Sequence, residues 1–407
     1  MFEHVTPYPG DPILSLFQDF QKDAAPRKVN LSIGLYYDEK GAIPVLSSVR
    51  SAAARVAETG APHTYLPMEG TPAFRAAVQR LVFGEDCAAV REKRVATIQT
   101  LGGSGALRLG AEFIKRYFPD SAIWLSDPTW DNHRVLFVGA GLDVHSYPYY
   151  DRETNGIRFD DMLATLDTLP ARSVVLLQPC CHNPTGIDMT REQWQAVIAR
   201  LTQRQLIPFI DMAYQGFGDG LAEDAWPIRA LCDAGLAFLV SNSFSKNFSL
   251  YGERCGGLSF VCASEREAAS VLSQVQAGVR RMYSSPPLHG TQLISTVLND
   301  VELTAQWDAE VAGMRSRIKR MRAALRERLE AAVPGMSFDY LTTQRGMFSY
   351  TGILPAEVDV LRERYSVYLL RSGRLCVAGL NDANLDLVAD AIGTVLNARS
   401  NACASLS

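Results

Sequence analysis

The stretch FLVSNSFSKNFSLYGERCGGLSFV, residues 238–261, contains two apolar segments joined by a short polar connection. About 16 residues separate Phe238–Ser241 from Leu258–Val261, and the serines and glycines among them oppose a helix. Two neighbouring parallel strands need a crossover of a dozen or more residues, which is usually helical. This connection is tight for such a crossover, so we expect the second strand to run antiparallel to the first.

Further apolar runs lie on both sides of this stretch and alternate with amphipathic segments, two of which are Gly105–Phe118 and Arg191–Arg204. The expected strands are Val95–Thr100, Ala122–Ser126, Val144–Tyr147, Ser173–Gln178, Ile207–Asp211, Phe238–Ser241 and Leu258–Val261. This alternation is typical of a mostly parallel sheet covered on both faces. We predict an α/β fold whose seven-stranded sheet has one antiparallel strand.

The chain of 407 residues, 47% of them hydrophobic, can form one large core and a second, smaller one. A charged amphipathic pattern from Val301 to about Ala332 predicts a long helix that links two lobes. Strand-like runs follow it at Met347–Thr351, Val367–Leu370 and Leu375–Val377. We expect a large domain over residues 46–300 and a small α+β domain formed by residues 1–45 and 301–407.

The charge of the chain is nearly balanced, with 40 Lys and Arg residues against 44 Asp and Glu residues. The net charge of −4 gives no field that would attract nucleic acid or an anionic membrane, so we expect neither partner. No apolar run is long enough to span a bilayer, and no signal peptide is visible. Eight scattered cysteines suggest neither a disulfide framework nor a zinc site, so we expect a cytoplasmic protein and no metal.

The string LGGSGA at residues 101–106 follows a predicted strand and opens a predicted helix. Backbone amides and a hydroxyl at a helix N-terminus can hold a phosphate, although glycine-rich turns also occur for packing reasons. A dinucleotide fingerprint would need a glycine where Arg108 stands. A nicotinamide cofactor is therefore disfavoured, and a phosphate role remains open from this motif alone.

Lys246 lies just after a predicted buried strand, with Ser243 before it and Arg254 eight residues beyond it. Desolvation favours the neutral amine that condenses with carbonyl groups, and a serine and an arginine suit a phosphate dianion. A lone lysine in a turn is more often an ordinary surface residue. Ser243-x-x-Lys246 also matches the serine-lysine motif of penicillin-recognising enzymes, but the accompanying strings SDN and KTG are absent from this sequence.

Two further candidates lie where predicted strands end. Asp211 is followed by Tyr214, and Asn183 precedes a proline and a glycine in HNPTG. Ligands of open α/β sheets bind at the carboxyl ends of the strands, where a carboxylate could keep a pyridinium nitrogen protonated. An ordinary helix N-cap at Asp211 and an ordinary turn at Asn183 are the alternatives.

Several separated strings occur together in one order: QTLGGSGAL, SDPTWDNH, PCCHNPTG, DMAYQGFG, SNSFSKNFSLYGERCG, VRRMYSSPP and SGRLCVAG. In this combination the chain, from Pro12 to about Asp390, resembles the class I, fold-type-I aminotransferases, which depend on pyridoxal 5′-phosphate. Within that family it is most similar to the bacterial aromatic-amino-acid (tyrosine) branch. The resemblance implies transamination between phenylalanine, tyrosine or tryptophan and 2-oxoglutarate, with side activity on aspartate and glutamate.

The resemblance also implies roles for single residues. Lys246 would carry the cofactor as a Schiff base and then move the substrate proton. Asp211 would pair with the pyridinium nitrogen, and His133 would support Asp211 from behind. Trp130 would stack on the pyridine ring. Asn183 and Tyr214 would hydrogen-bond the ring hydroxyl oxygen.

The same resemblance assigns the cofactor phosphate to Gly103, Ser104, Ser243 and Arg254. Tyr65, in HTYLPMEG, looks like the tyrosine that reaches the phosphate from the other subunit. The resemblance therefore implies a homodimer whose active sites are shared between subunits.

Arg374, in SGRLCVAG, would bind the substrate α-carboxylate through its planar fork. Arg280 would bind the side-chain carboxylate of dicarboxylic substrates, although the adjacent Arg281 competes for this role. We expect Arg280 to swing out, or to stay hydrated, when an aromatic substrate binds, because a buried unpaired guanidinium is costly. Gly34 would belong to a flap over the substrate.

Two other functions remain possible at this point. An aspartate aminotransferase would share every catalytic residue with an aromatic one. A pyridoxal-phosphate lyase or regulator is the other alternative. A regulator of this fold would need an added DNA-binding module, for which the chain has no room, and a lyase would not need both Arg280 and Arg374.

Overall fold

The computed structural model describes residues 1–8 and 10–404, which form two compact units. The large unit is Pro44–Arg317, and the small unit combines the N-terminal segment up to Ile43 with the chain from Ile318 onward. Within the described chain, no helix combines the length and the hydropathy that crossing a membrane requires.

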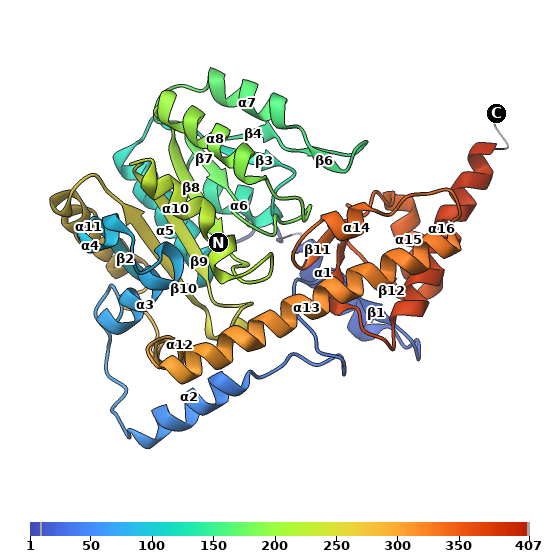
Figure 1. Ribbon diagram of the computed structural model, residues 1–407, viewed down its shortest axis with the longest axis horizontal. Coiled ribbons are helices and arrows are strands. Elements are labelled where there is room, and N and C mark those ends of the chain that lie inside the picture. The colour runs from blue at the N-terminus through green and yellow to red at the C-terminus, as the bar shows by residue number, and fades with distance from the viewer. Residues whose placement is uncertain (9, 405–407) are drawn as a thin grey trace. The chain divides into compact units, whose positions relative to one another are not determined.

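The large unit is built on a seven-stranded sheet (Figure 1). Its strands are β2 (Val95–Leu101), β3 (Ile123–Asp127), β4 (Val144–Pro148), β7 (Val174–Leu177), β8 (Ile207–Met212), β9 (Phe238–Ser243) and β10 (Cys255–Val261). They lie in the order β2-β10-β9-β8-β7-β3-β4. Every neighbouring pair is parallel except the two that include β10, so the predictions of an α/β sheet and of one antiparallel strand are confirmed.

Helices cover both faces of this sheet. Side chains along a strand point alternately to its two faces, and every residue of β7, β9 and β10 is buried. The first group of helices is α5 (Gly102–Tyr117), α6 (Asp131–Gly139) and α11 (Glu265–Met282). These helices pack on one another and share a core with the sheet that includes Leu107, Phe137, Phe209 and Val279.

The other helices of the large unit contact mainly one another and strands of the sheet. They are α2 (Ser47–Glu58), α3 (Pro72–Phe83), α4 (Ala88–Arg91), α7 (Phe159–Thr168), α8 (Arg191–Gln203), α9 (Leu221–Asp224), α10 (Trp226–Asp233) and α12 (His289–Leu298). Short pieces complete the unit, namely the antiparallel strands β5 (Tyr150–Asp151) and β6 (Gly156–Ile157) and a 3₁₀ turn at Tyr251–Glu253. Local sequence sets several boundaries, as at α8, where Thr190 and Gln193 form a reciprocal capping box.

The small unit contains two short strand pairs. Strands β1 (Val29–Asn30) and β12 (Val367–Tyr368) are parallel, and β11 (Phe348–Tyr350) and β13 (Arg374–Cys376) are antiparallel. Its helices are α1 (Pro12–Lys22), α14 (Tyr340–Thr343), α15 (Pro355–Tyr365) and α16 (Leu385–Ala404), with a 3₁₀ turn at Val377–Gly379. The predicted long helix is α13 (Val301–Ala332), and the boundary between the units falls within it, after Arg317.

Candidate functional site

Candidate residues of the large unit gather where its parallel strands end. Asp211 is the last but one residue of strand β8, Asn183 follows β7, and Lys246 follows β9. Trp130 follows β3 and precedes the first residue of α6. Because the carboxyl ends of parallel strands share one edge of a sheet, these four residues from distant parts of the sequence lie along that edge.

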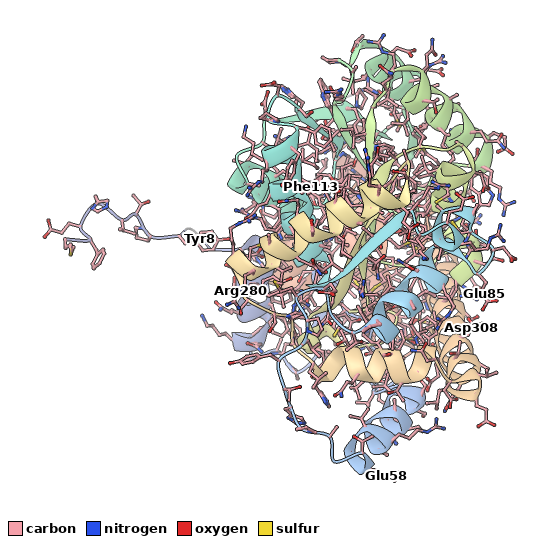
Figure 2. All side chains as sticks on the ribbon, turned by 90° about the vertical axis from the view of Figure 1, so that its left-hand side faces the viewer. Tyr8, Glu58, Glu85, Phe113, Arg280 and Asp308 are labelled. Atoms are coloured by element: carbon pink, nitrogen blue, oxygen red, sulfur yellow. The ribbon has the colours of Figure 1, made fainter. Side chains whose placement is uncertain are left out.

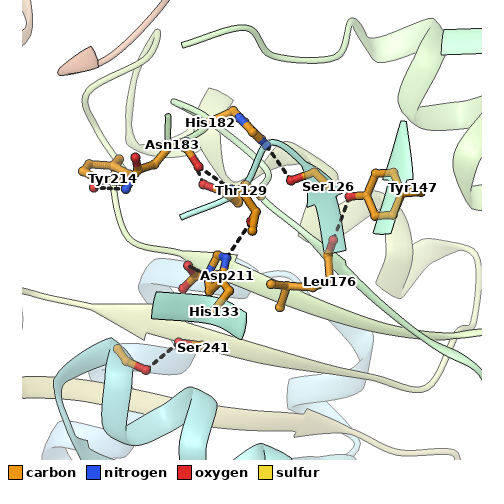
Figure 3. Close-up of polar contacts among 12 residues, drawn as sticks. Ser126, Thr129, His133, Tyr147, Leu176, His182, Asn183, Asp211, Tyr214 and Ser241 are labelled. Atoms are coloured by element: carbon orange, nitrogen blue, oxygen red, sulfur yellow. Dashed lines mark hydrogen bonds and ion pairs between the residues drawn. The ribbon is translucent and has the colours of Figure 1, made fainter. Parts of the chain in front are cut away.

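A buried chain of polar contacts leads to the Asp211 carboxylate (Figure 3). His133 Nε2 lies 3.0 Å from Asp211 Oδ2, and Thr129 Oγ1 lies 2.7 Å from His133 Nδ1. An ionised carboxylate only accepts hydrogen bonds, so Nε2 donates, and in the neutral imidazole Nδ1 accepts from Thr129. The Trp130 ring meets the His133 ring edge to face at 5.2 Å. Thr129 and Trp130 together fix the imidazole that orients Asp211.

Asn183, Tyr214 and Lys246 form a second group at the same edge. The Asn183 amide nitrogen donates to the Tyr214 hydroxyl over 3.4 Å, and Lys246 Nζ lies 4.8 Å from the centre of the Tyr214 ring. Gln178 fixes the Asn183 backbone, because its side chain accepts from the Asn183 N–H at 2.8 Å and donates to the Asn183 carbonyl at 3.1 Å. Asn183 and Tyr214 are buried, whereas Lys246 is half-buried.

The N-terminus of α5 forms a cradle with the loop between β9 and β10. A Cβ atom on Gly102 would lie 2.8 Å from Arg254 Nη2, and one on Gly103 would lie 3.3 Å from Ser243 Cβ. Gly102 also has a φ of +67°, which favours glycine. The Ser243 hydroxyl donates to Ser245 Oγ at 3.2 Å, and Arg254 Nη1 donates to the same oxygen at 3.4 Å. Helix amides, hydroxyls and a guanidinium at one point fit a phosphate dianion.

Strand pairing joins this cradle to the Asp211 group. Ser241 lies opposite Asp211 in the register of β8 and β9, and its hydroxyl donates to the Gly103 carbonyl over 3.3 Å. Ser104 is half-buried in the first turn of α5. The structure therefore brings the expected phosphate ligands and the expected ring ligands to the same edge of the sheet in the large unit.

His182, next to Asn183, lies in a separate hydrogen-bond network. Its Nε2 lies 2.9 Å from Ser126 Oγ (Figure 3). Its Nδ1 lies 2.8 Å from Thr185 Oγ1, and its ring stacks on Tyr149 at 4.2 Å. Burial, reinforced by the nearby His133, lowers the pKa of His182 to about 3. His182 is therefore a neutral residue that holds the segment leading to Asn183.

Two expected substrate residues lie together in the small unit. The Arg374 guanidinium is buried, lies 4.3 Å from the centre of the Phe348 ring, and donates to the Ser32 carbonyl at 2.6 Å. A Cβ atom on Gly34 would lie 2.8 Å from Phe348 Cζ, so this approach requires glycine. Gly34, Phe348 and Arg374 form one packed group.

Tyr65 and Arg280 share a surface hollow of about 450 Å³ in the large unit. Tyr65 is 93% exposed. Arg280 lies near the C-terminal end of α11 (Figure 2). Its guanidinium donates to Ser284 Oγ at 2.5 Å. Arg281 instead lines a small cavity with Phe113 on α5. The two adjacent arginines therefore face different surroundings, and only Arg280 accompanies Tyr65.

Sequence patterns did not identify several residues that support this pocket, including Thr129, Gln178, Ser241, Ser245 and Phe348. Ser245 and Ser241 lie in the string SNSFSKNFSLYGERCG and Thr129 lies in SDPTWDNH, so their places in these strings were the available signals. Thr129 and Gln178 contact residues only four and five positions away, whereas Ser241 and Phe348 contact Gly103 and Arg374 through tertiary structure.

Comparison with known proteins gives a consistent result. A family model described as aminotransferase class I and II matches residues 26–392. The aromatic-amino-acid aminotransferase of Escherichia coli K12 is 58% identical, with 97% of this chain and 100% of that protein covered. An aspartate aminotransferase of Pseudomonas aeruginosa is 47% identical with the same coverage. The structure of an aromatic-amino-acid aminotransferase from Burkholderia pseudomallei, covalently bound to pyridoxal phosphate, matches with a TM-score of 0.96 at 48% identity and covers 97% of this chain and 99% of that one.

Proposed function

Because this chain belongs to the class I and II aminotransferases, we propose that it transfers amino groups between aromatic amino acids and 2-oxoglutarate, using pyridoxal 5′-phosphate. The observation that carries this proposal is that Lys246 lies beside Tyr214, at the same sheet edge as the buried Asp211. Aspartate and glutamate are further substrates in this proposal. The preference for aromatic donors is supported by the higher identity to an aromatic relative, 58%, than to an aspartate relative, 47%.

The residues at this sheet edge would each have a separate role in binding the cofactor or in moving a proton. When bound, pyridoxal phosphate supplies an electron sink for the negative charge that develops at the substrate Cα. The Asp211 carboxylate would keep a proton on the ring nitrogen, and Trp130 would cover one ring face. Asn183 and Tyr214 would hydrogen-bond the ring hydroxyl oxygen. Lys246 would hold the cofactor covalently through Nζ and, once substrate is bound, take the proton from Cα.

We assign the cofactor phosphate to Gly103, Ser104, Ser243 and Arg254, which are at or beside the cradle at the start of α5. A further ligand would be Tyr65 of the partner subunit. This assignment requires a homodimer with shared active sites. It is supported by the exposure of Tyr65, because a large aromatic side chain that is 93% exposed in one chain is available to a second copy.

Substrate recognition would use the two arginines in different ways. Arg374 would pair with the α-carboxylate that all amino-acid substrates share, and Gly34 would close over it. Arg280 would pair with the second carboxylate of 2-oxoglutarate, glutamate or aspartate. We further propose that residues 46–300 act as the cofactor domain and that residues 1–45 and 301–407 act as a small domain that closes on the substrate.

We also propose a cytoplasmic location for the enzyme. Seven of the eight cysteines have side chains that the structure describes, and these seven form no disulfide, which suits a reducing compartment.

Two measurements on the cofactor-loaded protein test the function. Adding phenylalanine should bleach the imine absorbance band, and adding 2-oxoglutarate should restore it. The ratio of kcat/KM for phenylalanine to that for aspartate, both with 2-oxoglutarate, then separates the aromatic reading from an aspartate aminotransferase. A chain whose band does not respond to either amino acid is not a transaminase, and a ratio well below one identifies an aspartate enzyme.

A further inference from the structure

A compact cluster of sulfur and oxygen atoms lies within the large unit, where strands β7 and β8 end. Cys180 and Cys181 follow strand β7, and Asp224 ends helix α9; all three are buried, and their ligand atoms lie within 4.8 Å of one another. The Cys180 thiol also lies 3.7 Å from the thioether sulfur of Met212, the last residue of β8. Three sulfur atoms and one carboxylate from three elements therefore lie at one place.

We propose that Cys180, Cys181 and Asp224 bind a thiophilic metal ion, with Met212 as an additional ligand, and that the bound ion slows the enzyme. Thiolate and thioether ligands select soft ions over hard ones such as magnesium and calcium. A tetrahedral ion with metal–sulfur bonds of about 2.3 Å keeps its ligands about 3.8 Å apart. Cys180 and Met212 already have this separation, and because the ligand atoms of Cys180, Cys181 and Asp224 lie within 4.8 Å of one another, they need to approach by at most about 1 Å.

The position of the carboxylate in the cluster is fixed by backbone hydrogen bonds. Asp224 accepts from the N–H groups of Gly216 at 2.8 Å and of Gly218 and Asp219 at 2.9 Å. Such outer contacts orient a ligand before the ion arrives and raise the affinity of a metal site. The Asp224 carboxylate is therefore already oriented for binding, and the two thiols are the ligands that move when the ion binds.

Binding of a divalent ion exchanges protons for the metal. The S–H bonds of Cys180 and Cys181 break, two sulfur–metal bonds form, and one proton from each thiol passes to solvent. The hydrogen bond between the Cys180 and Cys181 side chains, together with burial and the Asp224 charge, raises the pKa of the Cys180 thiol. Protons therefore compete strongly with the ion, and affinity rises with pH.

The link to activity rests on the proposed function. Cys181 is two residues from Asn183, and Met212 directly follows Asp211. The N–H groups of Cys181 and His182 both donate to Asp188, at 2.7 and 2.9 Å, so this segment is held firmly in the metal-free protein. An ion that draws the thiols toward Asp224 and Met212 pulls against these bonds and displaces two groups assigned to the cofactor ring.

The test uses the holoenzyme with Cd²⁺ as the probe. The wild-type protein should keep about one ion per chain after gel filtration, show an ultraviolet thiolate-to-cadmium charge-transfer band, and release one proton from each thiol into a weakly buffered solution. Cys180→Ala and Cys181→Ala should each lose the band and raise the half-inhibitory Cd²⁺ concentration at least about tenfold. The matched control Cys262→Ala, another buried thiol of the large unit, should behave as the wild type.

A second pair of thiols makes the test decisive. Cys87 and Cys232 are half-buried, and their thiols are hydrogen-bonded to each other. The proposal is overturned if Cys87→Ala abolishes Cd²⁺ retention, or if the double variant Cys180→Ala/Cys181→Ala retains the ion. Retention without inhibition would overturn the link to activity. A protein that retains Cd²⁺ through Cys180 and Cys181 but transaminates no amino acid would refute the proposed function and leave the metal site standing.

Discussion

His133 Nε2 lies 3.0 Å from Asp211 Oδ2, at a point where both side chains are almost fully buried. Burying an ionised carboxylate is costly unless hydrogen bonds or an opposite charge compensate for the lost water. The imidazole supplies one hydrogen bond, and a protonated ring nitrogen of the cofactor would supply the charge. Asp211 is therefore a group whose burial makes physical sense once the cofactor is bound.

Replacing Asp211 with asparagine should lower kcat for phenylalanine by roughly 10²–10³-fold, because a neutral amide does not hold the ring nitrogen in its protonated form. Asp211→Glu, which keeps the charge, should recover part of the loss. Asp143→Asn, which alters an exposed carboxylate paired with His145, should leave kcat unchanged. Stopped-flow or steady-state rates would measure all three, and an Asp211→Asn rate within about threefold of wild type would contradict the assigned role.

Replacing Lys246 with alanine should lower kcat by at least roughly 10³-fold, since both the covalent anchor and the proton carrier are lost. Borohydride reduction of the cofactor-loaded wild type should label Lys246, which peptide mapping would reveal. Lys93→Ala, which removes an exposed partner of Glu265, serves as the control and should retain full activity. Labelling of a different lysine would refute the assignment.

Replacing Arg280 with alanine should separate the two substrate classes. A charged hydrogen-bonded pair contributes about 1.5–3 kcal/mol, so kcat/KM for glutamate should fall roughly 10- to 100-fold. Phenylalanine turnover should fall much less, because its ring makes no ion pair. Arg281→Ala, which alters the arginine beside Phe113, should affect neither substrate strongly. The idea fails if Arg280→Ala harms phenylalanine as much as glutamate, or if Arg281→Ala gives the substrate split instead.

Stability should depend on pH through His182, whose pKa falls from 6.5 to about 3 on folding. Between these values the unfolded chain holds a proton that the folded chain lacks, so the free energy of unfolding decreases as pH falls below 6.5. The slope is about 1.4 kcal/mol per pH unit for one such group. Denaturant titrations at pH 6.5 and 5 should show a decrease that is about 2 kcal/mol smaller in His182→Gln than in wild type.

The control for this dependence is His145→Gln, because His145 is exposed. Its pH dependence should match that of the wild type. Equal slopes for wild type and His182→Gln would show that the buried imidazole does not govern acid stability. The His182→Gln protein should also be less stable at neutral pH, because the contacts to Ser126 and Thr185 are altered.

The sheet could be predicted because its signals are local. Apolar runs such as Val174–Leu177 are buried on both faces, and the interval before β10 is tight for a helical crossover. The start of α5 could not be placed in the same way. The helix begins at Gly102, three residues before the expected Gly105, although glycine and serine are poor helix formers. Its first turn is set by tertiary contacts with Arg254 and Ser243.

Residues of the candidate site could be predicted only where they lie within recognisable sequence motifs. Lys246, Asp211 and Asn183 lie in such motifs, and the fold brings them to one edge of the seven-stranded sheet. The contacts of Gln178 and Thr129 reach residues only five and four positions away, but they depend on the turns that follow β7 and β3, which no recognised string specifies. The lowered pKa of His182 is likewise a result of burial, which a single histidine in a turn-like string does not reveal.

The antiparallel direction of β10 determines at which edge of the sheet its first residue lies. Because β10 runs against its neighbours, Cys255 starts at the rim where β9 ends, and the connection from Ser243 to Arg254 never leaves that rim. A seven-residue strand in the parallel direction would have started about 23 Å away, at the opposite rim. The lysine assigned to the covalent link and the arginine assigned to the phosphate thus belong to a single short loop. Any displacement of that loop would therefore disturb the proposed covalent link and the proposed phosphate contact at the same time.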